Sequence, residues 1–192
     1  MMQRDDRRAA ALELIAAGAR LAEAGLILPG EGNLSTRLDA ESCLITPAGA
    51  DKGRLRAVDF LALALRLDGS PVPTGASSEA GVHIAIYRRH AEVGAVLHAH
   101  TPRVQALAGR GLPPECGLLV EGTELLGTAA WVEPCPPGSR ALEEAVVAAL
   151  EQAPACVLAR HGALVVGRTV REALLRLLLL ERLAELTLER VR

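Results

Sequence analysis

The feature that most constrains the fold is an alternation between short apolar runs and longer segments of helical periodicity. Residues 77–90 repeat apolar side chains every three to four positions, which is typical of an amphipathic helix. The next segment, "VGAVLHAHT", is an apolar run of strand length. The order recurs where a helix over roughly 140–152, capped by Ser139, precedes two short β runs in "ACVLARHGALVVG". Strands alternating with helices predict an α/β or α+β fold around one sheet.

Capping signals place the ends of the other helices. Residues 4–24 have helical spacing and predict the first helix. Ser77 or Ser78 is expected to cap the helix that follows it. Thr169 and Glu172 have the spacing of a capping box, which predicts a long amphipathic helix from there towards the C-terminus.

Turn signals indicate how the strands pair. Asp68-Gly69 follows the alternating run "VDFLALALRL" and predicts a hairpin, so we expect much of the sheet to be antiparallel. Residues 117–127 fit neither the helical nor the strand period. With 192 residues and no linker or repeat, the chain is predicted to be a single three-layer domain over 1–192, with a central, largely antiparallel sheet flanked by helices.

Composition and charge argue against several classes of partner. The formal net charge is −2 and no long basic run occurs, so no nucleic-acid partner is expected. The N-terminus lacks the apolar core of a secretory signal, and the leucine run at 177–180 is too short to span a membrane. A cytoplasmic location with no membrane partner is therefore expected. The cysteines are expected to be free buried thiols rather than a shared metal site: Cys43, Cys116, Cys135 and Cys156.

Three histidines stand out because each lies at the end of a predicted strand. His98 and His100 are two positions apart, so in a strand both project from one face, with Cα atoms about 6.6 Å apart. One core and one exposed histidine is the alternative for this pair alone. His161, followed by Gly162, adds a third imidazole, and three protein ligands with an open position are typical of a catalytic zinc site. The other two histidines are expected to be a packing or supporting residue and an exposed residue, respectively: His83 and His90.

A second polar cluster, Ser77-Ser78-Glu79, lies at the predicted start of a helix. Free N–H groups and the helix dipole favour an anion such as phosphate there, although simple capping explains the same residues. The turns "GEGNLS" and "TPAG" are also rich in small donors, so the three loops are candidates for one phosphate site. A carboxylate beside a divalent metal is suited to proton abstraction next to a carbonyl, which fits a phosphorylated ketose.

In this order, the motifs "GNLS", "ITPAG", "SSE", "VLHAHT" and "RHG" resemble the class II aldolase/adducin family over nearly the whole chain. The resemblance implies one Zn²⁺ per subunit, or another divalent metal, held by His98, His100 and His161. It implies Glu79 as acid/base and fourth ligand, and a homotetramer with sites at subunit borders. It also implies a substrate-phosphate site: Gly32, Asn33, Ala48, Gly49, Ser77 and Ser78.

Within the family, "SSE" favours an aldehyde-lyase of carbohydrate metabolism. Such an enzyme reversibly cleaves a phosphorylated ketose like L-fuculose 1-phosphate to dihydroxyacetone phosphate and a short aldehyde. The tyrosine that these aldolases use as an acid is missing near Cys116–Leu118.

The alternative within the family is a methylthioribulose-1-phosphate dehydratase. "TPAGADKG" and "EGTELLG" match that type, with Glu124 as acid/base; a solvated helix charge is the other interpretation of Glu124. A ribulose-phosphate 4-epimerase ranks lower because it carries Asp in place of Glu79. A non-catalytic scaffold module ranks last because such modules lose the histidines.

Overall fold

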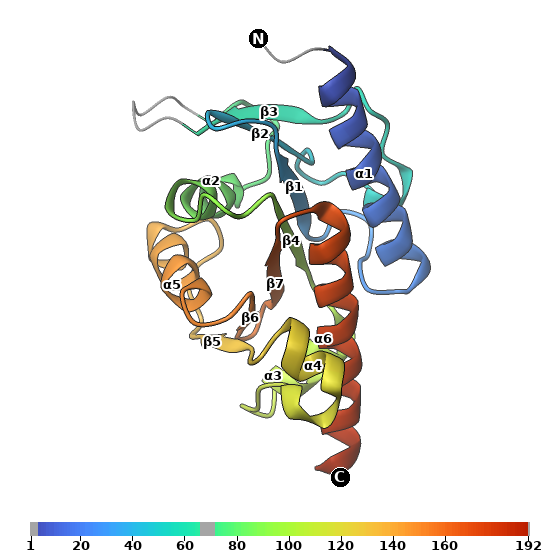
Figure 1. The fold of residues 1–192 in the computed structure, drawn as a ribbon, viewed down its shortest axis with the longest axis vertical. Coiled ribbons are helices and arrows are strands. Elements are labelled where there is room, and N and C mark those ends of the chain that lie inside the picture. The colour runs from blue at the N-terminus through green and yellow to red at the C-terminus, as the bar shows by residue number, and fades with distance from the viewer. Residues whose placement is uncertain (1–3, 66–71, 192) are drawn as a thin grey trace.

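The computed structural model describes residues 4–65 and 72–191, and in these ranges the chain forms three layers (Figure 1). The middle layer is a seven-stranded sheet of order β3-β2-β1-β4-β7-β6-β5. Only β5 and β6 pair in parallel, so the prediction of a largely antiparallel sheet is confirmed. The hairpin predicted at Asp68-Gly69 lies outside the described residues. The strands are β1 Asn33–Arg37, β2 Ser42–Ile45, β3 Leu61–Ala64, β4 Ala95–Ala99, β5 Ala130–Val132, β6 Ala155–Leu158 and β7 Gly162–Gly167.

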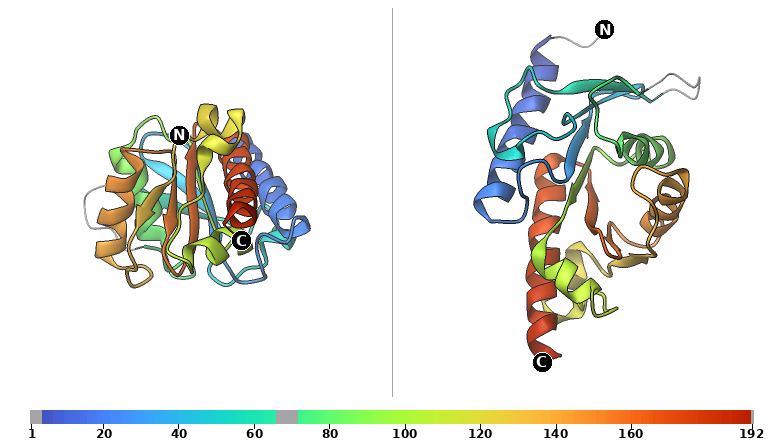
Figure 2. Two further views of the ribbon diagram at one scale, coloured as in Figure 1. Left: turned by 90° about the horizontal axis from the view of Figure 1, so that it is seen from below. Right: turned by 180° about the vertical axis from the view of Figure 1, so that it is seen from behind.

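Helices cover both faces of the sheet, as two of the views show (Figures 1 and 2). Alternate residues of β4 explain why: Leu97 joins a hydrophobic cluster on one face, and Val96 joins another on the opposite face. The first face is covered by α1 Arg4–Glu23, α3 Pro102–Ala108, α4 Val120–Leu125 and α6 Val170–Arg190. The second face is covered by α2 Ala80–Arg89 and α5 Arg140–Leu150.

Most predicted helix boundaries hold within one or two residues. The helix predicted over 4–24 is α1, and the Ser139 hydroxyl caps α5 by accepting from the Leu142 amide. Two 3₁₀ turns, η1 Lys52–Arg54 and η2 Cys116–Leu118, complete the elements of the described ranges. The ambiguous segment 117–127 thus contains the end of η2 and the short helix α4.

Two capping predictions need correction. Glu79, not Ser77 or Ser78, occupies the N-cap of α2, and its side chain makes no cap hydrogen bond. The Ser77 hydroxyl instead accepts from the Glu79 amide, two residues along the chain, before the helix begins. At α6 the Thr169 hydroxyl accepts from Glu172 as predicted, but the Glu172 carboxylate accepts from Arg168 rather than from Thr169.

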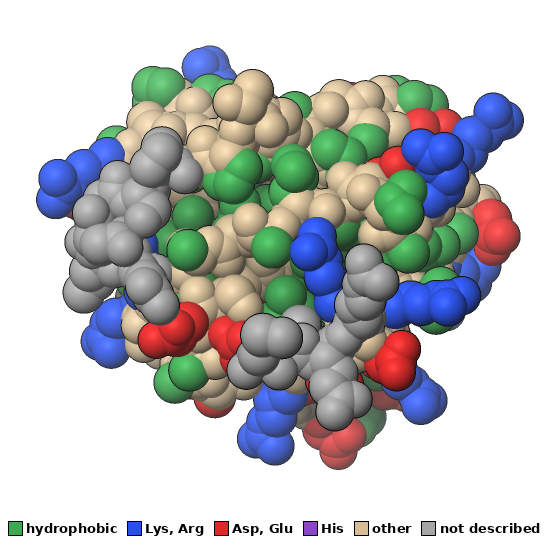
Figure 3. Space-filling model, turned by 90° about the horizontal axis from the view of Figure 1, so that it is seen from above, with side chains coloured by type: hydrophobic (Ala, Val, Ile, Leu, Met, Phe, Trp, Pro, Cys, Tyr) green, Lys and Arg blue, Asp and Glu red, His purple; other side chains and the backbone are tan. Residues whose placement is uncertain are grey.

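The surface and the cysteines agree with the sequence on several points. On the face shown in Figure 3, acidic and basic side chains are interspersed around the rim. Across the described ranges, none of the helices has the length and apolar character that a bilayer crossing requires. All four cysteines are free; three are buried and Cys135 is half-buried, so the expectation of free thiols is confirmed.

Candidate metal centre

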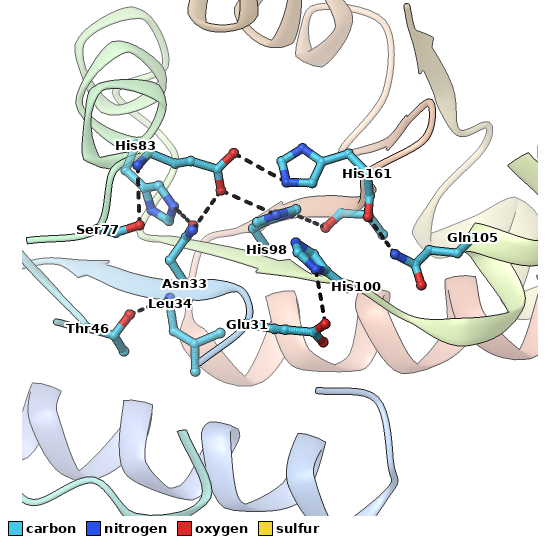
Figure 4. Close-up of polar contacts among 12 residues, drawn as sticks. Glu31, Asn33, Leu34, Thr46, Ser77, His83, His98, His100, Gln105 and His161 are labelled. Carbon is cyan, nitrogen blue, oxygen red and sulfur yellow. Dashed lines mark hydrogen bonds and ion pairs between the residues drawn. The ribbon is translucent and has the colours of Figure 1, made fainter. Parts of the chain in front are cut away.

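Three imidazoles meet at the ends of the central strands. His98 lies in β4, His100 follows its last residue, and His161 lies in the turn between β6 and β7 (Figure 4). The ring centroids are 5.0 Å apart for His98–His100, 4.7 Å for His98–His161 and 4.9 Å for His100–His161. One nitrogen from each ring lies within 4.8 Å of the other two, a spacing that can hold a single metal ion.

Two glycines allow the backbone to come close enough for this arrangement. A Cβ atom on Gly162 would lie 2.5 Å from the carbonyl oxygen of Ala99, and one on Gly32 would clash with the carbonyl oxygen of His98. Gly32 also has a positive φ of 63°. The β4 backbone is therefore packed between two glycines at the point where it presents its histidines.

Replacing Gly162 with alanine is expected to destabilise the protein by about 1–3 kcal/mol, because backbone must move to relieve the clash with Ala99. The displacement would also move His161, so metal content should fall. Chemical denaturation and metal analysis would measure both effects. Gly117→Ala is the matched control, since a Cβ there meets nothing within 4 Å. Equal stability of the two variants would contradict this explanation.

His98 has the hydrogen bonding of a metal ligand. Its Nδ1–H donates to the carbonyl of Ala163 at 2.9 Å, which leaves Nε2 with a lone pair. That Nε2 is buried and has no hydrogen-bond partner among the described residues. Burial, with smaller contributions from His161 and His100, lowers the pKa of His98 to about 3. A neutral imidazole with an unsatisfied, buried lone pair fits a bound cation.

Two carboxylates border the cluster. Glu79 is buried, with Oε2 3.3 Å from Nε2 of His98 and Oε1 3.6 Å from Nε2 of His161. Its Oε1 has no hydrogen-bond partner among the described residues, so it is free to accept a proton or a cation. Glu31 lies with Oε1 3.6 Å from Nδ1 of His100 (Figure 4). Sequence reasoning missed Glu31, although it lies inside the "GEGNLS" turn.

The predicted phosphate loops lie next to one another. The Gly30 amide donates to the carbonyl of Ala50, and Pro47 forms a β-bridge with Ala76. The loops that contain "GEGN", "TPAG" and "SSE" therefore converge, as the small-donor pattern suggested. Of the residues predicted to bind phosphate on these loops, Ala48, Gly49 and Ser78 are exposed.

Two of the residues expected to bind phosphate contact Glu79 in this structure. The amide nitrogen of Asn33 donates to Oε2 of Glu79 at 2.8 Å, and its Oδ1 lies 2.5 Å from Nε2 of His83. The Ser77 hydroxyl accepts from the Glu79 amide. Both side chains are buried, so in this structure their polar atoms hold Glu79.

The remaining candidate residues behave differently from one another. His83 is fully buried at the back of the site, in agreement with a packing or supporting role. The expectation that His90 is exposed is wrong: its side chain is 11% exposed, because it folds under the end of α2 with Nδ1 3.5 Å from Glu92. Glu124 is exposed on α4, which packs against α6 and η2, and it makes no hydrogen bond or ion pair to any described residue.

Comparison with known proteins assigns the chain and its fold to a family. A model of the class II aldolase and adducin N-terminal domain matches residues 12–188. The chain belongs to the class II aldolase and adducin family. The crystal structure of L-fuculose-1-phosphate aldolase from Thermus thermophilus superposes with a TM-score of 0.85 at 32% identity, covering 97% of this chain and 95% of that one. The resemblance and the three-layer fold expected from the sequence are confirmed.

The curated relatives of this class II aldolase family member are named as dehydratases rather than as fuculose-phosphate aldolases. Methylthioribulose-1-phosphate dehydratase from Acidiphilium cryptum is 41% identical over 118 residues, which are 60% of this chain and 54% of that protein. The enzyme of that name from Stenotrophomonas maltophilia is 43% identical over 108 residues, 55% of this chain and 49% of that protein. The aligned part of the chain spans about half the length of these curated relatives. Class II aldolases are metal-dependent, and the histidine cluster is where a metal fits in this chain.

Proposed function

We propose that the protein is a metal-dependent enzyme acting on a phosphorylated ketose, with Zn²⁺ held by His98, His100 and His161. The support is the convergence of three imidazole nitrogens beside the buried carboxylate of Glu79. When bound, the metal would polarise the substrate carbonyl and stabilise the negative charge that develops on its oxygen. The unpartnered Oε1 of Glu79 would take the proton from the carbon next to that carbonyl.

The reaction that we propose is dehydration of methylthioribulose 1-phosphate. The observation that carries this proposal is the name shared by curated relatives at about 40% identity. These relatives favour the dehydratase over the aldolase, whereas the "SSE" motif favoured the aldolase. In such a dehydration the carbon next to the ketone loses a proton, and the neighbouring carbon loses its hydroxyl group as water. The resulting enol then tautomerises to a second ketone. Glu79 supplies the base for the first step.

Aldol cleavage of L-fuculose 1-phosphate is the second candidate. It is favoured by the similarity to the Thermus aldolase over almost the full length of both chains. In the cleavage direction Glu79 would take the hydroxyl proton of the departing carbon, the carbon–carbon bond would break to release the aldehyde, and Glu79 would return the proton to the remaining enediolate to give dihydroxyacetone phosphate. Both candidate reactions therefore place the same carboxylate beside the same substrate carbon.

The substrate phosphate would bind at the three converging loops. We propose that Gly32, Ala48, Gly49 and Ser78 donate to it, while Asn33 and Ser77 act mainly through Glu79. A homotetramer with sites at subunit borders, as in the family, remains part of the proposal. If the sites lie at subunit borders, the exposed Glu124 would serve as the dehydratase acid/base in the centre of a neighbouring copy.

A product assay separates the two reactions. Metal-loaded protein is incubated with methylthioribulose 1-phosphate and, separately, with fuculose 1-phosphate. We expect a diketone from the first substrate and no dihydroxyacetone phosphate from the second. Release of dihydroxyacetone phosphate, with methylthioribulose 1-phosphate left unchanged, would overturn the dehydratase proposal in favour of the aldolase.

The variant Glu124→Gln tests the dehydratase acid/base directly. We expect kcat for dehydration to fall about 100-fold or more, as for loss of a general acid or base. Glu121→Gln is the matched control, because Glu121 is also exposed on α4. Unchanged turnover in Glu124→Gln would leave Glu79 as the group that handles both protons.

A further inference from the structure

A buried row of polar side chains leads from Glu79 into the core between α2 and β1. Nδ2 of Asn33 is 2.8 Å from Oε2 of Glu79, and Oδ1 of Asn33 is 2.5 Å from Nε2 of His83. On the other side of the ring, Nδ1 of His83 is 2.6 Å from Oγ of Ser35, which is 2.8 Å from the hydroxyl of Tyr87. The four side chains beyond Glu79 are each at most 3% exposed. Figure 4 shows the end of this row at Asn33 and His83.

The row exists because side chains on one face of α2 and side chains on one face of β1 are spaced at almost the same distance. Glu79, His83 and Tyr87 are four residues apart on α2 and its N-cap, so they share one face with a spacing of about 6 Å. Asn33 and Ser35 are two residues apart on β1 and share one face with a spacing of about 6.6 Å. The strand side chains therefore fit between the helix side chains in turn.

Each hydrogen bond in the row has a fixed direction. An ionised carboxylate only accepts, so Asn33 must turn its NH₂ group to Glu79 and its carbonyl oxygen to His83. His83 must then carry its proton on Nε2 and accept at Nδ1 from the Ser35 hydroxyl. Since that hydroxyl proton is committed, Tyr87 donates to Ser35. Every donor points towards Glu79.

We propose that Ser35, His83 and Tyr87 are positioning residues that act through Asn33 to hold Oε2 of Glu79 beside Nε2 of His98, so that Oε1, beside Nε2 of His161, stays free of hydrogen bonds. The inference rests on the proposed role of Glu79 in proton transfer. If the His83 ring adopted its other tautomer, the Asn33 amide would flip and present an oxygen to the carboxylate. Repulsion between the two oxygens would then move Glu79 from its place beside His98 and His161.

The test uses two neighbouring hydroxyls on β1. Ser35→Ala removes the donor to His83, and Tyr87→Phe removes the donor behind it. Thr36→Val is the matched control, because the Thr36 hydroxyl is also buried and hydrogen-bonded, but to the carbonyl of Gly94 and outside the row. Ser35→Ala is expected to lower kcat about 10-fold with little change in KM, and Tyr87→Phe about 3-fold. Thr36→Val should lower the melting temperature to a similar extent while kcat is unchanged.

A second readout does not depend on activity. Nitrogen-15 NMR of the His83 ring should show the Nε2–H tautomer in the native protein and a shift towards Nδ1–H in Ser35→Ala. A native Nδ1–H tautomer would overturn the proposal, as would equal kcat in Ser35→Ala and Thr36→Val. If the native protein turned over neither candidate substrate while the tautomer was as expected, the proposed function would fail and the positioning of Glu79 would stand. If Ser35→Ala does not fold, Tyr87→Phe carries the kinetic test, and unchanged kcat there would count against the row.

Discussion

Replacing His98 with alanine is expected to abolish metal binding and to lower kcat/KM about 1,000-fold or more. The Nε2 lone pair of His98 is buried and unpartnered, and its loss leaves two of the three imidazoles of the cluster. Loss of the metal removes several kcal/mol of stabilisation of the developing charge, and about 1.4 kcal/mol corresponds to a tenfold change in rate. Metal content per chain and steady-state kinetics on both candidate substrates would measure the effect.

The control for this variant is His90→Gln. His90 is also largely buried, but it contacts Glu92 at the far end of α2 rather than the cluster. We expect its metal content and turnover to match those of the native protein. Full metal content in His98→Ala would show that the three imidazoles do not form the binding site.

Glu79→Gln is expected to lower kcat about 100- to 10,000-fold, the usual range for a lost general acid or base. The amide cannot take the substrate proton, yet it fills the same space, so KM should change little. Because the native carboxylate is buried with Oε1 unpartnered, removing its charge should raise the free energy of unfolding of the metal-free protein by about 1 kcal/mol. Stopped-flow kinetics and chemical denaturation would measure these two effects.

An exposed carboxylate provides the comparison. The Glu92 side chain is 70% exposed, so Glu92→Gln removes a negative charge that is already solvated. Neither its turnover nor its stability should change measurably. If Glu79→Gln retained native kcat, proton transfer would have to be assigned to another group, and Glu124 would be the next to test.

The helices and their capping residues could largely be predicted from the sequence. Ser139 and Thr169 accept from the amides that their spacing predicts, and α1 matches the predicted helix almost to the residue. These features follow from hydrogen bonds and side-chain periods that span only three or four residues. The N-cap of α2 was predicted one to two residues early because Ser77 and Ser78 are both good local caps, whereas the structure has Glu79 at that position, with its carboxylate accepting from Asn33.

The motifs around His98, His100 and His161 were also enough to indicate a metal site and the family. The residue types alone indicated the metal site, because three imidazoles at strand ends are a donor set typical of a metal centre. The sequence did not show which side chains, far apart along the chain, contact one another. Glu31 beside His100 and the burial of His90 depend on how loops fold back onto the sheet.

What the sequence determined by itself is therefore the set of elements, their amphipathic faces and the residue types that meet at the centre. What only the tertiary structure decided is which polar group contacts which. Asn33 is an example: its motif suggested a phosphate donor, but the register of β1 against α2 places its amide between Glu79 and His83. That register is fixed by packing over some fifty positions of sequence separation, and no local pattern carries information over that distance.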